Sequence, residues 1–245
     1  MTKSCVSKKE PVWKVFIISA ILITVLAFTL IYMQKFGLIR ESTDYLYSST
    51  CILIILMSTL YSSNYDIYKY IMNKIKITRR QLFIIHIPIC VALIERAVTN
   101  ILQILSYLHG KGIIKPAKGQ LVFNSPTILD KILSTSVVAP FLEEFIFRLL
   151  FFSVIKYLLN KITKNKNISQ EVLDLDSIPC WILIVINSTL FSLMHLPDAS
   201  NFHLYYIGGI VNCIIYLKYG FFSSVVAHSI YNLVHLNFIF NLFIL

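Results

Sequence analysis

Residues 137–152 read VVAPFLEEFIFRLLFF, an apolar run that contains Glu143, Glu144 and Arg148. Insertion scales put a charge at the centre of a membrane helix at roughly 2.5 to 3.5 kcal/mol, so such side chains are functional candidates by default. Glu144 and Arg148 are four residues apart on one helical face and can pair. Glu143 points about 140° away from Arg148 around the helix. We therefore expect Glu143 to be the carboxylate available for chemistry. For Glu144 and Arg148, an ion pair that only holds helices together is the alternative.

The rest of the chain is also strongly apolar. Of its 245 residues, 57% are hydrophobic and only 14% are charged, against about 25% charged in soluble domains. This composition excludes a soluble domain, whose surface could not cover so much apolar side chain. The net charge of +10 comes from basic residues that lie mainly between the apolar runs. That pattern predicts contact with anionic lipid headgroups and argues against nucleic acid as a partner.

Seven apolar runs approach or exceed the length of about 20 residues that a membrane helix needs. They predict an all-α fold, a polytopic transmembrane helix bundle with about seven spans, whose first run is a retained helix and not a signal peptide. The fourth helix should run through Pro140 with a kink. The expected spans are Trp13–Met33, Tyr45–Tyr61, Leu82–Tyr107, Pro126–Leu159, Trp181–Leu196, Phe202–Tyr219 and Ser223–Leu245.

Basic residues concentrate in alternate connections of this bundle, namely the N-terminus and the segments 62–80 and 160–177. Because cytoplasmic loops carry the excess of Lys and Arg, we expect a multi-pass cell-membrane protein with its N-terminus in the cytoplasm. The lysines of the segment 111–118 fall on the outer side and count against this orientation.

Two further polar pairs lie in apolar runs. Phe191 and His195 share a helical face, and so do His228 and Asn232, because each pair is four residues apart. Hydrolysis by an activated water needs a base, a group that holds the water and donors for the oxyanion. Residues of these types are Glu143, His195, His228 and Asn232. Glu143 and the two histidines could also hold one divalent metal such as zinc, and spacing does not decide whether a metal is used. Interhelical hydrogen bonds are the plainer alternative for each histidine.

The ordered motifs resemble the CPBP family, the CAAX-protease and bacteriocin-processing (Abi) intramembrane endopeptidases. The motifs are Glu143-Glu144-x-x-x-Arg148, Phe191-x-x-x-His195 and His228-x-x-x-Asn232, with Gly220 and Ser223 leading into the last. Any one motif is weak evidence, but three in order are strong. The resemblance covers about 127–236, under half of the chain. The chain accordingly divides into 1–126, about three transmembrane helices with basic loops, and 127–245, a CAAX-protease/Abi-like catalytic helical core.

The resemblance implies an intramembrane endopeptidase that cuts a peptide or protein substrate at the membrane. In the family picture, Glu143 with His195 activates water, and His228 with Asn232 stabilises the oxyanion. The supporting residues would be Glu144, Arg148 and Phe191. Bacterial members imply a role in bacteriocin processing, self-immunity or peptide signalling. The family is often labelled metalloprotease, and whether a zinc ion takes part stays open.

Other functions compete with proteolysis. A non-proteolytic membrane immunity or partner-binding protein could retain the same motifs. A proton-coupled transporter would use intramembrane charges such as Glu95 and Arg96, but the matching inverted halves of many transporters are not visible. Because adjacent residues point about 100° apart on a helix, at least one of Glu95 and Arg96 should contact another helix, and substrate contact is a further role for them. A last alternative treats all the motifs as packing contacts.

The predicted topology sets one condition on the site. If the run Phe202–Tyr219 crosses the membrane completely, His195 and His228 lie at opposite depths. They can meet if the helices tilt, if the fifth helix extends past Pro197, or if the sixth helix is short.

Overall fold

The computed structural model describes residues 43–63, 65–112, 114, 132–163 and 166–235. Every regular element among these residues is a helix, which confirms the all-α class, while the number of spans stays a prediction. The helices are α2 (Thr43–Ser63), α3 (Tyr65–Ile75), α4 (Arg79–Phe83), α5 (His86–Leu108), η1 (Leu133–Val138), α7 (Ala139–Glu144), η2 (Phe145–Leu150), α8 (Phe151–Thr163), α9 (Lys166–Val172), α10 (Ile178–Met194), α11 (Phe202–Tyr219) and α12 (Phe221–His235).

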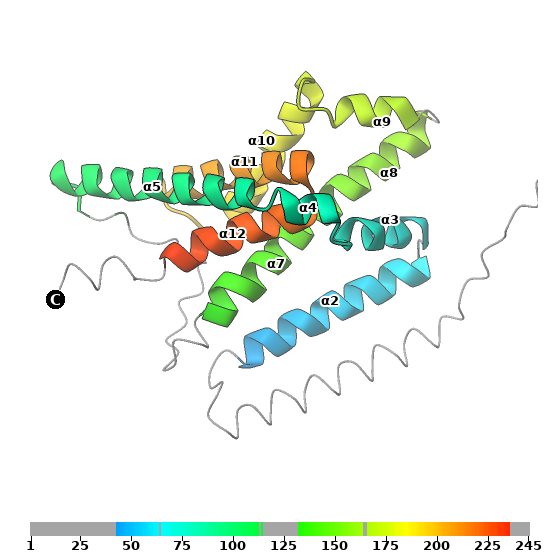
Figure 1. Ribbon diagram of the computed structural model, residues 1–245, viewed down its shortest axis with the longest axis horizontal. Helices are drawn as coiled ribbons and strands as arrows, with labels where there is room; N and C mark the ends of the chain where they lie inside the picture. Colours follow the sequence, from blue (N-terminus) through cyan, green and yellow to red (C-terminus); the bar gives the residue numbers. More distant parts are fainter. Residues whose placement is uncertain (1–42, 64, 113, 115–131, 164–165, 236–245) are drawn as a thin grey trace, which may run out of the picture.

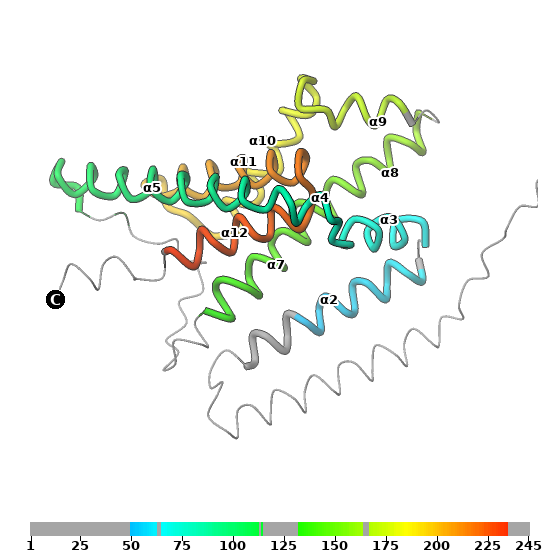
Figure 2. Tube along the Cα trace, viewed as in Figure 1, coloured from blue at the N-terminus to red at the C-terminus, as the bar shows by residue number. Residues whose placement is uncertain are grey.

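The centre of the bundle is formed by α5, α10, α11 and α12 (Figure 1). α12 lies along α5 and against α11, and α11 in turn packs on α10. The elements η1, α7, η2 and α8 form one continuous helix that crosses α12 (Figure 2). Helix α12 therefore contacts both α5 and the crossing helix, and its side chains can meet those of α7.

The crossing helix is widened by π-helical turns on both sides of α7. Pro140, in the first turn of α7, has no N–H, and its ring crowds the carbonyl group four residues earlier. The N–H of Ala139 donates to the carbonyl of Ser134, five residues back, so the wider turn of η1 accommodates the proline without ending the helix. Single π turns inside helices are frequent at functional sites. The proline predicted to kink this helix is thus absorbed by a π turn directly before Glu143 and Glu144.

Both ends of α10 follow from its sequence. Ser177 caps the start by accepting a hydrogen bond from the N–H of Cys180 at 3.2 Å. At the other end, Leu196 adopts a left-handed conformation with φ 49°, and Pro197 follows, which cannot continue a helix. His195 is consequently fixed at the C-terminal end of α10, as the predicted stop at Pro197 requires.

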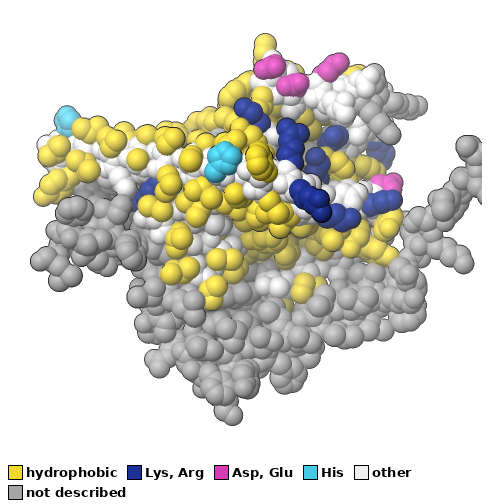
Figure 3. Space-filling model, in the orientation of Figure 1, with side chains coloured by type: hydrophobic (Ala, Val, Ile, Leu, Met, Phe, Trp, Pro, Cys, Tyr) yellow, Lys and Arg dark blue, Asp and Glu magenta, His cyan; other side chains and the backbone are white. Residues whose placement is uncertain are grey.

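Polar side chains lie inside the bundle and large apolar ones outside it. The buried polar and charged residues include Ser134, Glu144, Arg148, Asn187, Ser188, Asn212 and Ser224. The exposed apolar residues on α5 and α10 include Ile94, Val98, Ile101, Ile104, Ile182, Val185, Ile186 and Leu190. Figure 3 shows a largely hydrophobic surface over α5, with Lys and Arg side chains gathered to one side. This distribution suits a lipid environment, where helices join through small and polar residues.

Length and composition alone give a weaker indication of membrane spans. Among the described residues, α5 is the one helix both long and apolar enough to cross a bilayer, and a single such helix is weak evidence. The helices α10 and α12 and part of α2 are apolar but shorter. The multi-pass topology and the cytoplasmic N-terminus therefore stay predictions.

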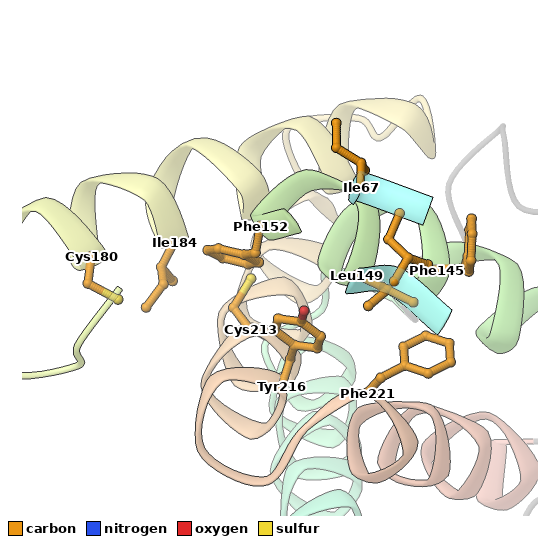
Figure 4. Packing of buried hydrophobic residues seen from close by; sticks show 10 residues of the cluster. Ile67, Phe145, Leu149, Phe152, Cys180, Ile184, Cys213, Tyr216 and Phe221 are labelled. Carbon is orange, nitrogen blue, oxygen red and sulfur yellow. The ribbon is translucent and has the colours of Figure 1, made fainter. Parts of the chain in front are cut away.

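Aromatic packing fixes the crossing helix against its neighbours (Figure 4). Tyr216 of α11 stacks on Phe152 of α8, with ring centroids 5.5 Å apart. Phe221, at the start of α12, meets Phe145 of η2 edge-on at 6.4 Å. Close packing of this kind contributes much of the free energy that holds helices together in lipid. It holds the face of α7 that carries the two glutamates against α12.

Most of the predicted runs that fall in the described residues correspond to helices. Phe202–Tyr219 is α11, Tyr45–Tyr61 lies within α2, and Leu82–Tyr107 is divided between α4 and α5. The run Trp13–Met33 lies outside the described residues, as do the start of the fourth run and the end of the seventh. The basic connections contain the short helices α3 and α9, which hydropathy did not predict.

Candidate functional site

Glu143, in the last turn of α7, meets side chains from two other helices. Its Oε2 atom lies 3.8 Å from Nε2 of His195, at the end of α10, and 3.7 Å from Nε2 of His228, in the middle of α12. This oxygen is buried and has no hydrogen-bond partner among the described residues. Three separate sequence motifs therefore converge on one point, and the two histidines meet there despite the helix of eighteen residues between them.

A series of buried charged side chains holds the imidazole of His228 in place. Its Nδ1 atom lies 2.9 Å from Oε1 of Glu144, and Oε2 of Glu144 lies 3.4 Å from Nε of Arg148. Arg148 also donates from Nη2 to the carbonyl of Gly209 on α11 at 3.2 Å. Its guanidinium carbon lies 4.4 Å from the ring centre of Phe191. The predicted pairing of Glu144 with Arg148 is confirmed, and the pair holds the imidazole of His228.

His195 is oriented by its own helix and by α11. Its Nδ1 atom lies 2.9 Å from the carbonyl oxygen of Phe191, one turn earlier. A carbonyl oxygen can only accept, so Nδ1 carries the hydrogen and Nε2 of the neutral ring carries a lone pair. The ring also stacks on Tyr205 of α11, with centroids 4.7 Å apart. The lone pair of His195 is thereby directed toward Glu143.

The same reasoning assigns the tautomer of neutral His228. Glu144 is a carboxylate in an ion pair, so it accepts the Nδ1 hydrogen of His228 and leaves a lone pair on Nε2. Two imidazole lone pairs and one carboxylate oxygen of Glu143 then face a common point. Acceptors cannot bond to one another. This arrangement can therefore bind and polarise a donor such as a water molecule. It can also hold a proton on one of the two imidazoles.

Asn232 lies one turn after His228 and makes a different contact. Its Nδ2 atom donates to the carbonyl of Thr135 in η1 at 2.9 Å. In the π-helical pattern of this turn, the residue five positions after Thr135 is Pro140, which has no N–H to offer. Asn232 supplies a donor there and ties α12 to the widened turn. A carboxamide nitrogen has two N–H groups, so one is left for another acceptor.

Two side chains of this centre were not predicted from the sequence. Ser224 of α12 lies close to Glu144 while its hydroxyl donates to the carbonyl of Phe221, and Tyr205 of α11 stacks on the ring of His195. Ser224 is four residues before His228 and therefore shares its helical face, so the helical period could have identified it. No sequence signal marks Tyr205, because its contact depends on how α11 packs beside the end of α10.

Whether the centre binds a metal stays a prediction. Carboxylate and imidazole groups are suitable zinc ligands. Among the residues that the structure describes, however, no group of three or more His, Cys, Asp or Glu side chains is arranged as a metal site. As placed, Glu143, His195 and His228 do not form a three-ligand centre.

The fold and the centre together define a class of protein: an all-helical, membrane-type bundle in which one carboxylate and two imidazoles from separate helices meet inside. Residues 125–234 match the family described as type II CAAX prenyl endopeptidase Rce1-like. Over these residues the chain is similar to this CAAX-protease family, which bears out the resemblance carried by the three motifs. The family is membrane-embedded, and the match supports a protease. A comparison with curated proteins and one with solved structures gave no match.

Proposed function

We propose that this protein is an intramembrane endopeptidase in which Glu143 and His195 activate a water molecule for attack on a peptide bond. The observation that carries the proposal is the position of Glu143 Oε2, buried and without a partner, between the Nε2 atoms of His195 and His228. A carboxylate held in this way accepts a proton from a water bound at the same point.

The water oxygen then forms a bond to the carbonyl carbon of the substrate while its proton passes to Glu143. The protonated Glu143 returns this proton to the leaving amine when the peptide C–N bond breaks. His195 accepts a hydrogen bond from the water through Nε2, because its Nδ1 is occupied by the carbonyl of Phe191. Orientation of the water between two acceptors lowers the entropic part of the barrier.

The oxyanion that forms on the substrate needs donors. His228 can donate through Nε2 when it carries a hydrogen on each ring nitrogen, since Glu144 holds Nδ1. Asn232 contributes the N–H that is not bonded to Thr135. In this proposal Glu144, Arg148 and Phe191 position His228 and do not touch the substrate.

The substrate is a peptide or protein segment at the membrane. The centre lies among helices whose outer faces are apolar, so a substrate must be able to enter from the lipid or its interface. The biological roles that we propose for this cleavage are bacteriocin processing, self-immunity or peptide signalling.

The test uses the full-length protein reconstituted in liposomes and a set of apolar fluorogenic peptides. Replacing the base by its neutral isostere, Glu143→Gln, should lower kcat/KM by about 10²–10⁴-fold. The matched control is Glu171→Gln on α9, which removes one exposed carboxylate away from the centre. Cleavage that survives Glu143→Gln would contradict the proposal.

The same preparation separates the competing functions. Ion flux that requires Glu143 but not His195 would indicate a transporter. A cellular phenotype that survives Glu143→Ala at normal expression would indicate a non-proteolytic immunity protein. Loss of cleavage with a chelator, restored by zinc, would show a metal requirement.

A further inference from the structure

A basic surface lies where α5, the helix with the length and composition of a membrane span, begins. Residues 65–83, which contain α3 and α4, hold five Lys and Arg side chains and one carboxylate. Figure 3 shows Lys and Arg side chains gathered on one face, over the place of α4 in Figure 1, with hydrophobic side chains beside them. Two further lysines come from α8 and α11. We define the basic surface by Lys69, Lys74, Lys76, Arg79, Arg80, Lys156 and Lys218.

Packing of α3 on α8 brings two of these lysines to the same tyrosine. Nζ of Lys74 lies 5.7 Å from the ring centre of Tyr70, and Nζ of Lys156 lies 5.5 Å from the same ring centre. The two ammonium groups repel each other at this separation. None of the seven basic side chains forms an ion pair with a carboxylate among the residues that the structure describes. The surface therefore presents a positive field that attracts anions.

The side chain of Gln81 holds α4 to the rest of the bundle. Its Nε2 donates to the carbonyl of Tyr219, at the end of α11, at 3.1 Å. Its Oε1 accepts from the N–H of Thr78 at 2.9 Å, and Thr78 Oγ1 accepts from the N–H of Gln81 at 3.2 Å, which completes a capping box. Gly220 leaves space for this side chain, because a Cβ atom there would lie 2.6 Å from Nε2. The orientation of α4 is therefore fixed, and Lys218 lies next to its anchor.

The outer face of α4 carries apolar side chains beside its basic ones. Phe83 is 83% exposed, and Ile77 and Leu82 are each more than half exposed. Arg79 and Arg80 lie between them in the chain and are also exposed. Helices that lie in the headgroup region of a bilayer combine these two kinds of side chain, with the apolar groups at the acyl chains and the cations at the phosphates. The exposed apolar side chains of α4 lead directly into the apolar surface of α5.

We infer that the basic surface and the outer face of α4 bind the anionic phospholipid headgroups of the bilayer. Charge complementarity selects an anion, and continuity with the apolar surface of α5 selects a lipid, which supplies acyl chains for Phe83 as well as phosphates for the arginines. An acidic protein would match the charges alone. Because Gln81 ties α4 to the turn between α11 and α12, this contact sets the depth of that turn in the membrane. The inference is independent of peptide hydrolysis.

The experiment measures the lipid preference of the full-length protein in neutral maltoside micelles. Fluorescence anisotropy gives the dissociation constants of a labelled phosphatidylglycerol and of a phosphatidylcholine with the same chains and label. The wild type should prefer phosphatidylglycerol by about tenfold or more, because one basic residue near lipid phosphates contributes about fivefold in affinity. Arg80→Gln should lower the preference about fivefold. The matched control Lys111→Gln removes an exposed charge beyond the other end of α5, and should change it less than about twofold.

Two more variants test the geometry of α4. Gln81→Ala keeps every charge but removes the bond to Tyr219, so it should weaken the preference about twofold or more. Phe83→Trp adds an indole whose emission is taken as the difference from the wild type in liposomes. Phospholipids brominated on their acyl chains should quench this added emission, because the side chain lies among those chains.

Each readout can overturn the inference. A phosphatidylglycerol preference that is absent from the wild type, that persists in Arg80→Gln, or that falls equally in Lys111→Gln would contradict it. Added emission that aqueous iodide quenches and brominated lipid does not would show that α4 faces water. Tighter binding of a soluble polyglutamate peptide than of phosphatidylglycerol would assign the surface to an acidic protein and overturn the lipid assignment. None of these measurements requires hydrolysis, so a failure here leaves the role of Glu143 untouched.

Discussion

The side chains of the centre are held in place by other buried side chains. Glu144 bonds to His228, Arg148 pairs with Glu144, and Arg148 in turn bonds to the carbonyl of Gly209. Arg148 and Glu144 are both fully buried. Removing one member of a buried pair leaves an uncompensated charge, which costs more than the pair itself contributes.

This arrangement predicts the stability of variants at the pair. Arg148→Met should lower the free energy of unfolding by about 3–5 kcal/mol, because Glu144 is left as a buried charge. The double variant Glu144→Gln with Arg148→Met should be more stable than Arg148→Met alone, since no charge remains to be compensated. Unfolding in mixed detergent micelles, followed by circular dichroism, measures both. A double variant less stable than either single variant would show that the pair is not the source of the loss.

The directions of the two adjacent glutamates could be predicted from sequence, because helical angles alone direct Glu144 to Arg148 and Glu143 away from it. Their partners across the bundle could be predicted only as residue types. Which histidine contacts which glutamate depends on helix packing, and so do the contacts of Ser224 and Tyr205. Glu95 was marked by its cost in an apolar helix, but only the structure shows that its Oε1 atom rests against α11.

At the scale of elements, the π turn before Pro140 and the amide of Asn232 form one unit. The proline removes an N–H from the turn, and Asn232 donates to the carbonyl of Thr135 in that turn. The turn before Pro140 and the motif that contains Asn232 are therefore linked by this hydrogen bond. This gives Asn232 a positioning role that its proposed contact with the oxyanion does not require.

The hydrogen bond from Asn232 to the turn before Pro140 predicts that these two residues are coupled in their effect on stability. Asn232→Ala should cost about 1–3 kcal/mol of unfolding free energy in the natural background, because the partly buried carbonyl of Thr135 loses a donor. In a Pro140→Ala background the cost should be smaller, since residue 140 regains an N–H that can serve the turn. A double-mutant cycle of thermal unfolding in detergent measures this coupling. Equal costs in the two backgrounds would contradict it.

The elements themselves were predictable to different degrees. α11 matches its predicted run because Pro197 precedes it and Gly220, with φ 90°, ends it. The helices α3 and α9 were missed because short helices in basic segments carry no long apolar run. The π turns were also not predicted, because a proline in an apolar run is as compatible with a simple kink as with a π turn.

On the scale of the whole molecule, the proposed catalytic residues come from the matched segment, but part of their surroundings does not. α5 precedes residues 125–234 and packs along α12, which carries His228. It brings Glu95 close to the centre. The proposed catalytic residues thus lie within the match, whereas α5, which packs along α12, lies before it.

The central claim is that Glu143 and His195 act together on one water, and a kinetic double-mutant cycle tests it most directly. Single-turnover cleavage at excess enzyme is measured for the wild type, Glu143→Gln, His195→Ala and the double variant. Residues that act as a unit have strongly non-additive effects, so the double variant should be about as slow as the slower single variant. A double variant slowed by the product of the two single effects, or near-wild-type cleavage in His195→Ala, would contradict the claim.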